Sequence, residues 1–206
     1  MKAFVCTGLM GVMLSAGAAS AVDVYTDEGA FLAQVDTFYL EDFDWAFYGG
    51  YTELTWDGGP VNGYAYTLSC FAGADGGSGD FLLWTNDGAM STNSALDGIR
   101  ADFTGDPVYA VGGWFYASDF NGFYQPGETI IGLADGTSYP FMPGNGTDFR
   151  GFVSDIPIAW MTVDAPDGAA LAWPAMDHFY VGNLIPAPTT AALFGLAGLT
   201  TLRRRR

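Results

Sequence analysis

The stretch TIIGLADGT, residues 129–137, shows the pattern that decides the fold class of this chain. A short run rich in β-branched residues, 129–133, is followed closely by Asp135 and Gly136. Runs of this kind favour a strand, and Asp-Gly supplies the positive φ that a tight hairpin turn requires. The stretch therefore predicts a strand that ends in a hairpin turn.

The same alternation of turn clusters and apolar runs continues on both sides of this stretch. Gly, Asn, Asp and Pro gather at intervals of about ten residues, in the segments 57–60, 75–77, 86–88, 105–107, 135–136, 143–146 and 167–168. Apolar, aromatic or β-branched runs lie between them, at 37–40, 64–69, 81–85, 108–116, 129–133, 149–153 and 158–163. Strands of this spacing indicate an all-β fold, a jelly-roll-like antiparallel β-sandwich with aromatic side chains between its sheets.

One segment departs from the strand pattern. Residues 26–35, TDEGAFLAQV, begin with residues that cap helices and with early acidic side chains. They place Phe31, Leu32 and Val35 on one helical face. We therefore expect one short helix ahead of the sheets.

The first 21 residues have the organisation of a signal peptide. Lys2 supplies a positive charge, an apolar run follows as far as Ala16, and Ala19 and Ala21 fit an A-x-A cleavage site. We expect residues 1–21 to be removed on export, so that the exported domain, 22–185, starts near Val22. A helix of the protein core is the alternative interpretation.

The last 21 residues, 186–206, also consist of three parts in a fixed order. Pro186, Ala187 and Pro188 precede the apolar run 189–202, and the chain closes with Arg203, Arg204, Arg205 and Arg206. A helix over that run would span about 21 Å, short of a hydrocarbon core of about 30 Å, and the arginines would stay cytoplasmic. The order predicts a C-terminal membrane anchor, and an amphipathic or disordered tail is the alternative.

This tail resembles the PEP-CTERM sorting signal of bacteria that make exopolysaccharide, with Ala187 where that motif has Glu. The resemblance implies an exosortase-like transpeptidase as partner, transient anchoring in the inner membrane, and delivery to the cell surface or extracellular matrix. The segments 110–115, 118–122, 133–137, 151–155 and 177–182 are similar to β-sandwich ectodomains that accompany such tails.

The segment 22–185 is strongly acidic. It contains all 23 Asp and Glu residues against two arginines, Arg100 and Arg150, so its net charge is −21. Nucleic acid is excluded as a partner, because binding it needs a cationic surface that displaces counterions. Such acidity suits a salty medium, bound divalent cations or solubility alone. The segment has one cysteine, Cys70, which excludes a disulfide within it.

Several classes of catalysis find little support in the residue types present. The segment 22–185 has one histidine, His178 on an expected final strand, and no lysine. No Gly-x-Ser-x-Gly elbow is present, and His178 would have to be the base of any catalytic triad. A tetrahedral zinc site needs more His or Cys ligands, and no glycine-rich loop followed by Lys is present to bind phosphate. The two-carboxylate chemistry of glycoside hydrolases stays open, since Glu41, Asp42 and Glu53 lie near aromatic residues.

Calcium is the cofactor for which the sequence offers a motif. Asp119 and Asn121 place two oxygen ligands at alternate positions of a loop that contains Gly122. The same residue types form Asx turns without any metal. Both interpretations of the loop stay open.

Two groups of aromatic residues in expected loops are candidates for stacking on sugar rings. The first group is Trp45, Tyr48 and Tyr51, and the second is Phe123 and Tyr124, with Phe120 beside them. Aromatic faces combined with a few polar groups can recognise a small ligand. The alternative is that both groups belong to the core or cover hairpins.

These observations favour an exported surface or extracellular-matrix protein that is non-enzymatic and associated with exopolysaccharide. Glycan binding is its candidate activity, so polysaccharide is the expected partner. The alternative is a secreted, carboxylate-dependent glycoside hydrolase.

Overall fold

A computed structural model of the chain describes residues 22–46, 48–57, 63–86, 88–166 and 171–185. The predicted signal peptide, 1–21, and the predicted sorting tail, 186–206, lie outside the described residues. The tail includes Pro186, Ala187, Pro188 and the arginines Arg203, Arg204, Arg205 and Arg206.

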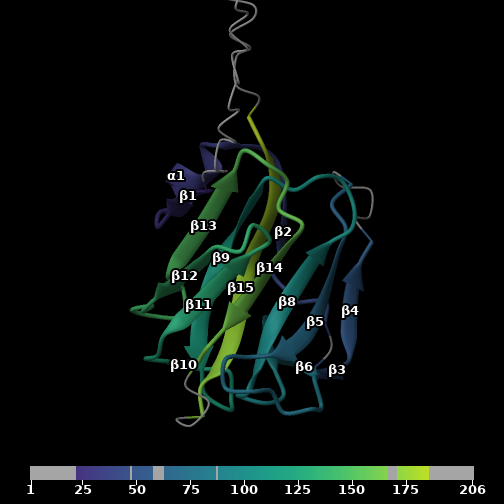
Figure 1. Cartoon of the computed structure of the whole chain (residues 1–206), viewed down its shortest axis with the longest axis vertical. Coiled ribbons are helices and arrows are strands. Elements are labelled where there is room, and N and C mark those ends of the chain that lie inside the picture. The colour runs from purple at the N-terminus through teal and green to yellow at the C-terminus, as the bar shows by residue number, and fades with distance from the viewer. Residues whose placement is uncertain (1–21, 47, 58–62, 87, 167–170, 186–206) are drawn as a thin grey trace, which may run out of the picture.

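Two antiparallel sheets make up the described part of the chain (Figure 1). Sheet A has nine described strands, in the order β1 (Val22–Tyr25), β13 (Phe149–Ser154), β9 (Ala110–Ser118), β15 (Trp173–Leu184), β7 (Ala89–Thr92), β6 (Leu83–Asn86) and β3 (Gly49–Tyr51), with β10 (Tyr124–Gln125) on β9 and β2 (Val35–Glu41) on β15. Sheet B has six described strands, in the order β12 (Ser138–Phe141), β11 (Thr129–Leu133), β14 (Trp160–Asp164), β8 (Asp97–Phe103), β5 (Tyr66–Ala72) and β4 (Glu53–Trp56).

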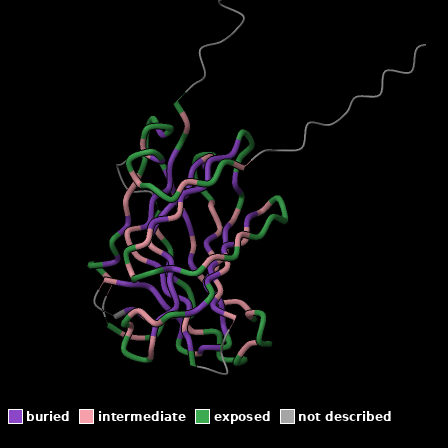
Figure 2. The backbone as a smooth tube through the Cα atoms, turned by 90° about the vertical axis from the view of Figure 1, so that its left-hand side faces the viewer, coloured by how far each residue is buried: buried purple, intermediate pink, exposed green. Residues whose placement is uncertain are grey.

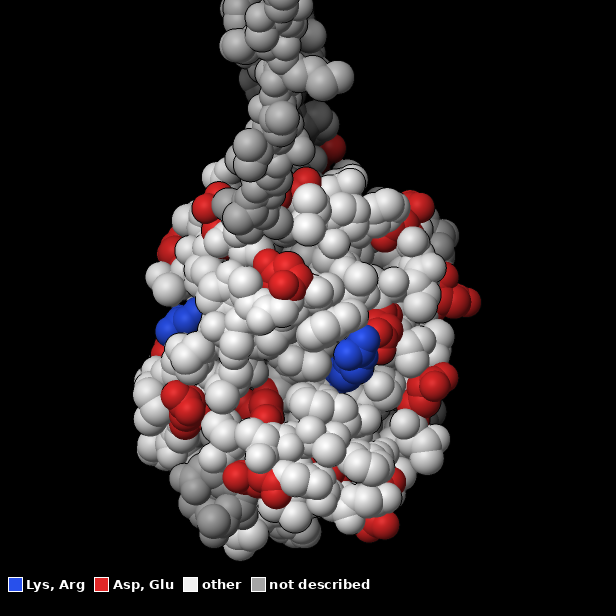
Figure 3. Space-filling view, viewed as in Figure 1, with Lys and Arg blue, Asp and Glu red and all other residues white. Residues whose placement is uncertain are grey.

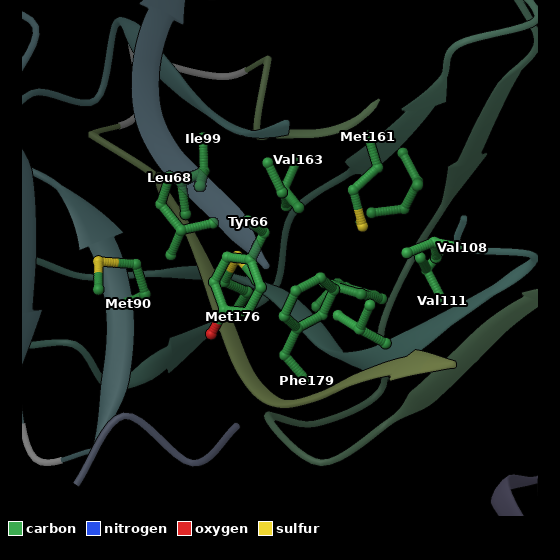
Figure 4. Close-up of a cluster of buried hydrophobic side chains, with 14 of the residues drawn as sticks. Tyr66, Leu68, Met90, Ile99, Val108, Val111, Met161, Val163, Met176 and Phe179 are labelled. Atoms are coloured by element: carbon green, nitrogen blue, oxygen red, sulfur yellow. The ribbon is translucent and has the colours of Figure 1, made fainter. Parts of the chain in front are cut away.

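The two sheets face each other across one hydrophobic core. Sheet B contributes Tyr66 and Val163 to this core, and sheet A contributes Val111 and Phe179 (Figure 4). The rings of Tyr66 and Phe179 meet edge to face, with 5.8 Å between their centroids. Burying a side chain of this kind contributes about 1.5–3 kcal/mol, and the buried segments run through the middle of the molecule (Figure 2).

The all-β prediction and the pairing of antiparallel strands are confirmed. The predicted runs correspond to β2, β5, β6, β9, β11, β13 and β14, and the expected final strand is β15. Strands outside the predicted runs are β1, β3, β4, β7, β8, β10 and β12. In β8, Arg100 and Asp102 interrupt the apolar pattern, but they pair with each other on the outer face while Ile99 and Ala101 are buried.

The predicted helix is present as α1 (Glu28–Leu32), with Asp27 as its N-cap. Asp27 Oδ1 accepts a hydrogen bond from Ala30 N at 2.7 Å. The expectation that the helix precedes the sheets is wrong, because β1 comes first and pairs with β13. Within the described ranges, no helix is long and apolar enough to cross a lipid bilayer.

Helix α1 packs on the outer face of sheet A through Phe31, which is fully buried. Its ring lies against Phe149, with 5.3 Å between centroids, and over two glycines of the sheet. A Cβ atom at Gly151 would lie 2.4 Å from Phe31 Cδ2, and one at Gly112 would lie 3.2 Å from the same ring. The missing side chains at these two positions therefore create the space that the helix occupies.

Candidate functional site

The strands β9, β15, β7 and β6 are consecutive neighbours in sheet A, and this order brings distant parts of the chain together. Trp173 at the start of β15 lies opposite Ser118 of β9. On the other side, Ser91 of β7 lies opposite Ala175 of β15 and opposite Trp84 of β6. The end of sheet A therefore collects residues from three separate regions of the sequence.

The outer face of these strands follows from strand alternation. Met90 and Met176 belong to the core between the sheets, so Ser91 and Ala175 point to the opposite face. Trp173 lies on the same face as Ala175, because the two are alternate residues of β15. Trp84 lies on the same face as Ser91, because residues paired across neighbouring strands point to the same side. Two tryptophans are thus presented on the outer face of sheet A.

A pocket of about 90 Å³ lies between these tryptophans. Its described lining is Trp84, Ser91, Thr92, Asn93, Asp119, Phe120, Gly122 and Trp173. The Phe120 ring, 80% exposed, stands edge-on to Trp173 at 6.1 Å between centroids. Outside the described lining, the Tyr48 ring, 72% exposed, stands edge-on to Trp84 at 5.3 Å. The pocket therefore combines aromatic faces with hydroxyl, amide and carboxylate groups.

Two of the polar groups in the lining are held in place by backbone carbonyls. Ser91 Oγ donates a hydrogen bond to Pro174 O at 2.8 Å, and Thr92 Oγ1 donates one to Ser94 O at 2.7 Å. The Ser91 oxygen keeps lone pairs that can accept a ligand donor, whereas Thr92 is 3% exposed and by alternation directs its side chain to the opposite face of β7, toward the core. Asn93 is exposed beside them and offers an amide that both donates and accepts.

The loop after β9 is organised by Asp119. Its Oδ1 accepts backbone N–H groups from Asn121 at 2.8 Å and Phe123 at 3.0 Å. Gly122, at φ 84°, completes the turn by donating its N–H to Asp119 O at 2.9 Å. These bonds are those of an Asx turn. Within the described ranges no group of three or more His, Cys, Asp or Glu side chains could hold a metal, and calcium at Asp119 and Asn121 stays a prediction.

The structure separates the predicted stacking residues into different environments. Tyr48 lies against Trp84 of the pocket lining, and Phe123, 70% exposed, belongs to the same loop as Phe120. Tyr124 instead donates its hydroxyl to Pro143 O at 2.6 Å. Tyr51, on β3, packs partly buried against the core. Trp45 lies beside Trp56, with 6.2 Å between ring centroids.

Sequence reasoning missed Trp84 and Trp173, the two rings that flank the pocket. Trp84 lies within the predicted run 81–85, where it resembles any core aromatic residue. The available signal was alternation, because Leu83 and Thr85 are buried and the residue between them must face outward.

Glu41, one of the acids considered for glycosidase chemistry, is 1% exposed. Its Oε1 accepts from Phe43 N at 2.9 Å and Trp45 Nε1 at 2.8 Å. Its Oε2 accepts from Tyr39 at 3.1 Å and Tyr66 at 2.7 Å. Four donors surround this carboxylate inside the protein, which is the arrangement of a structural acid.

His178 lies in a bulge of β15 on the outer face of sheet A. Its ring stacks on Trp114 at 4.3 Å, and its Nε2 lies 3.0 Å from the Tyr180 hydroxyl and 3.1 Å from Glu28 Oε1. The backbone of His178 has φ 50°, which a bulge accommodates. The histidine therefore connects α1 to β15.

Both arginines of the described chain lie away from the pocket lining. Arg100 forms a two-point ion pair with Asp102, at 2.8 and 2.6 Å, and its guanidinium lies 4.5 Å from the Trp160 ring centroid. On the face of the molecule seen in Figure 3, basic residues are few and acidic residues are scattered. Arg150 lies over Phe141 at 4.4 Å. The pocket therefore has one charged lining residue in the described structure, and it is negative.

A second pocket, of about 200 Å³, lies beside the hairpin of β11 and β12. Val22, Leu133, Ile156 and Ile158 are among its lining residues, and no aromatic ring is present in the described lining. This apolar hollow lacks the surfaces on which a sugar ring stacks.

Comparisons with known proteins leave the functional conclusion to the geometry and chemistry of this site. No protein-family model matches the chain, and no curated protein or solved structure matches it.

Proposed function

We propose that the chain is an exported surface or extracellular-matrix protein whose jelly-roll-like ectodomain binds glycan, without catalysis, at the pocket on sheet A. The observation that supports this function is the pocket itself, in which Trp84, Trp173 and Phe120 surround hydroxyl and amide groups. Apolar ring faces with a few polar groups that fix orientation suit a sugar, whose rings have apolar faces and hydroxyl edges. The proposal includes association of the exported protein with exopolysaccharide as its biological setting.

Binding without hydrolysis is supported by the acids of the site. Glycoside hydrolases of most families place two carboxyl groups on either side of the bond that breaks. Among the described lining residues Asp119 is the one carboxylate, and its Oδ1 already accepts two backbone N–H groups. Glu41 is enclosed by hydrogen-bond donors inside the protein. The described lining of this pocket therefore does not supply the second carboxylate that a secreted glycosidase would need.

Export and sorting are part of the proposal and rest on the two terminal segments. Cell fractionation of the full chain is expected to find it in envelope or extracellular material, with an N-terminus near Val22. The proposed Pro-Ala-Pro tail is expected to be processed by an exosortase-like enzyme, so that mature protein lacks Arg203–Arg206. Cytoplasmic protein that retains Lys2 would contradict export, and surface protein that retains all four arginines would contradict sorting alone.

Glycan binding is tested by removing the rings that flank the pocket. In the full chain, Trp84→Ala and Trp173→Ala are each expected to weaken binding to a glycan selected on an array by about tenfold or more, because aromatic anchors dominate such contacts. The matched control is Trp160→Ala, which removes a ring from the opposite sheet. Titration calorimetry measures the affinity and circular dichroism checks the fold. Equal affinity in all four proteins would contradict a site at this pocket.

A further inference from the structure

We propose that the glycan bound by this pocket carries free amino groups, so that it is a polymer of the glucosamine type and positively charged at neutral pH. This inference rests on the proposed function and specifies the chemical class of its ligand. It follows from the charges around the pocket and from the kind of rings that line it.

The first argument is charge complementarity. The segment 22–185 has a net charge of −21 and no lysine, and both arginines of the described chain are engaged outside the pocket. A uronic acid or a sulfated sugar would bring a negative charge against Asp119 with no cation in the described lining to meet it. The field of so acidic a domain attracts a cationic ligand and repels an anionic one.

The acidic character continues along β15 beyond the pocket. Asp177 has the side-chain direction of Trp173 by alternation, and their separation of four positions corresponds to about 13 Å of strand. Burial is the main reason that the pKa of Asp177 is raised, and the nearby carboxylates of Asp42 and Asp44 add to the rise. Asp177, on the same strand as Trp173, therefore has two further carboxylates near it.

The second argument comes from the aromatic rings. A cation is attracted to the face of an aromatic ring within about 6 Å, and tryptophan is the strongest of the natural rings in this respect. Two tryptophans and Phe120 line the pocket together with one carboxylate. An ammonium group on a sugar ring would interact favourably with both the aromatic faces and the Asp119 carboxylate. A hydroxyl or an acetamido group carries no charge and would make neither of these electrostatic interactions.

The experiment compares β-1,4-linked oligosaccharides that differ in one substituent. Chitosan, chitin and cellulose oligosaccharides of equal length carry an amino, an acetamido or a hydroxyl group at the same carbon, and alginate oligosaccharides supply the anionic comparison. We expect the full chain to bind the amino series on the order of fivefold to tenfold more tightly than the acetamido series. This preference is expected to shrink with added NaCl, because salt screens charge.

Two substitutions of equal charge separate the site from the general acidity. Asp119→Asn removes the charge but keeps an oxygen that can accept the backbone bonds of the turn, and it is expected to abolish the amino preference while neutral binding persists. Asp135→Asn is the control, because Asp135 accepts equivalent bonds from Thr137 in the β11–β12 hairpin. The control is expected to keep the preference.

The outcomes distinguish this inference from the proposed function. Equal affinity for the amino and neutral series, or tighter binding of alginate, would overturn the amino-sugar inference and leave glycan binding intact. Amino-series binding that survives Trp84→Ala and Trp173→Ala would show diffuse adsorption of a polycation, which also overturns the inference. Absence of binding to every series on the array would overturn the proposed function itself.

Discussion

Replacing Glu41 with alanine is expected to lower the free energy of unfolding by about 3–5 kcal/mol. The carboxylate accepts four hydrogen bonds, and the substitution leaves two buried donors, the Phe43 backbone N–H and the Tyr66 hydroxyl, without their acceptor in the protein interior. Each buried polar group left without a partner costs about 1–3 kcal/mol. Urea denaturation followed by tryptophan fluorescence measures the change.

Two further variants test this explanation. Glu53→Ala removes an exposed carboxylate from β4 and is expected to change the stability by no more than about 0.5 kcal/mol. Glu41→Gln keeps one carbonyl oxygen for Phe43 N and Trp45 Nε1, and its amide group can donate to the two tyrosine hydroxyls, so its cost should be clearly below that of Glu41→Ala. If Glu41→Ala and Glu53→Ala destabilise equally, the hydrogen-bonded cluster is not what stabilises this region.

Replacing Gly151 with alanine is expected to destabilise the protein by about 2–4 kcal/mol. The new Cβ atom would lie 2.4 Å from Phe31 Cδ2 and 2.9 Å from Phe149 Cε1, so the fully buried Phe31 ring must move. Displacing the ring weakens the attachment of α1 to the outer face of sheet A. Thermal and urea unfolding report the loss.

A control and a double mutant make this prediction specific. The control is Gly29→Ala in helix α1, where the added Cβ atom would make an ordinary contact of 3.4 Å with Asp27 Oδ1. Because alanine favours helix more than glycine does, the stability of this variant should be unchanged or slightly higher. In a Phe31→Ala background, Gly151→Ala should cost much less than in the native chain, because the clash is removed. Additive effects of the two substitutions would contradict the contact as the cause.

The fold class could be predicted because its signals are local. In the stretch 129–137 the β-branched run and the Asp-Gly turn are adjacent, and the structure has β11 followed by Gly136 at φ 86°. The strand β8 escaped prediction because Arg100 and Asp102 satisfy each other on the outer face. Such a pair hides the alternation of a strand from an analysis that counts apolar residues.

The pocket could not be predicted, because its components meet only through the order of strands in sheet A. Trp84, Asp119 and Trp173 come from three strands or loops that no local pattern connects. Asp119 shows the limit clearly, since its spacing to Asn121 indicates an Asx turn and a cation ligand equally well. Tyr48 and Phe120 were recognisable as exposed aromatic residues, but the tryptophans beside them determine where the site lies.

The position of β15 in sheet A has a consequence for the time at which this protein can fold. β15 pairs with β9 on one side and with β2 and β7 on the other, so strands from the beginning and middle of the domain depend on a partner near its end. Closing such long loops is slow and carries an entropic cost that later contacts must offset. The ribosome must therefore synthesise nearly the whole domain, as far as Leu184, before sheet A can assemble. A chain cut short before Trp173 would leave β2 and β9 as open edges able to pair with other molecules.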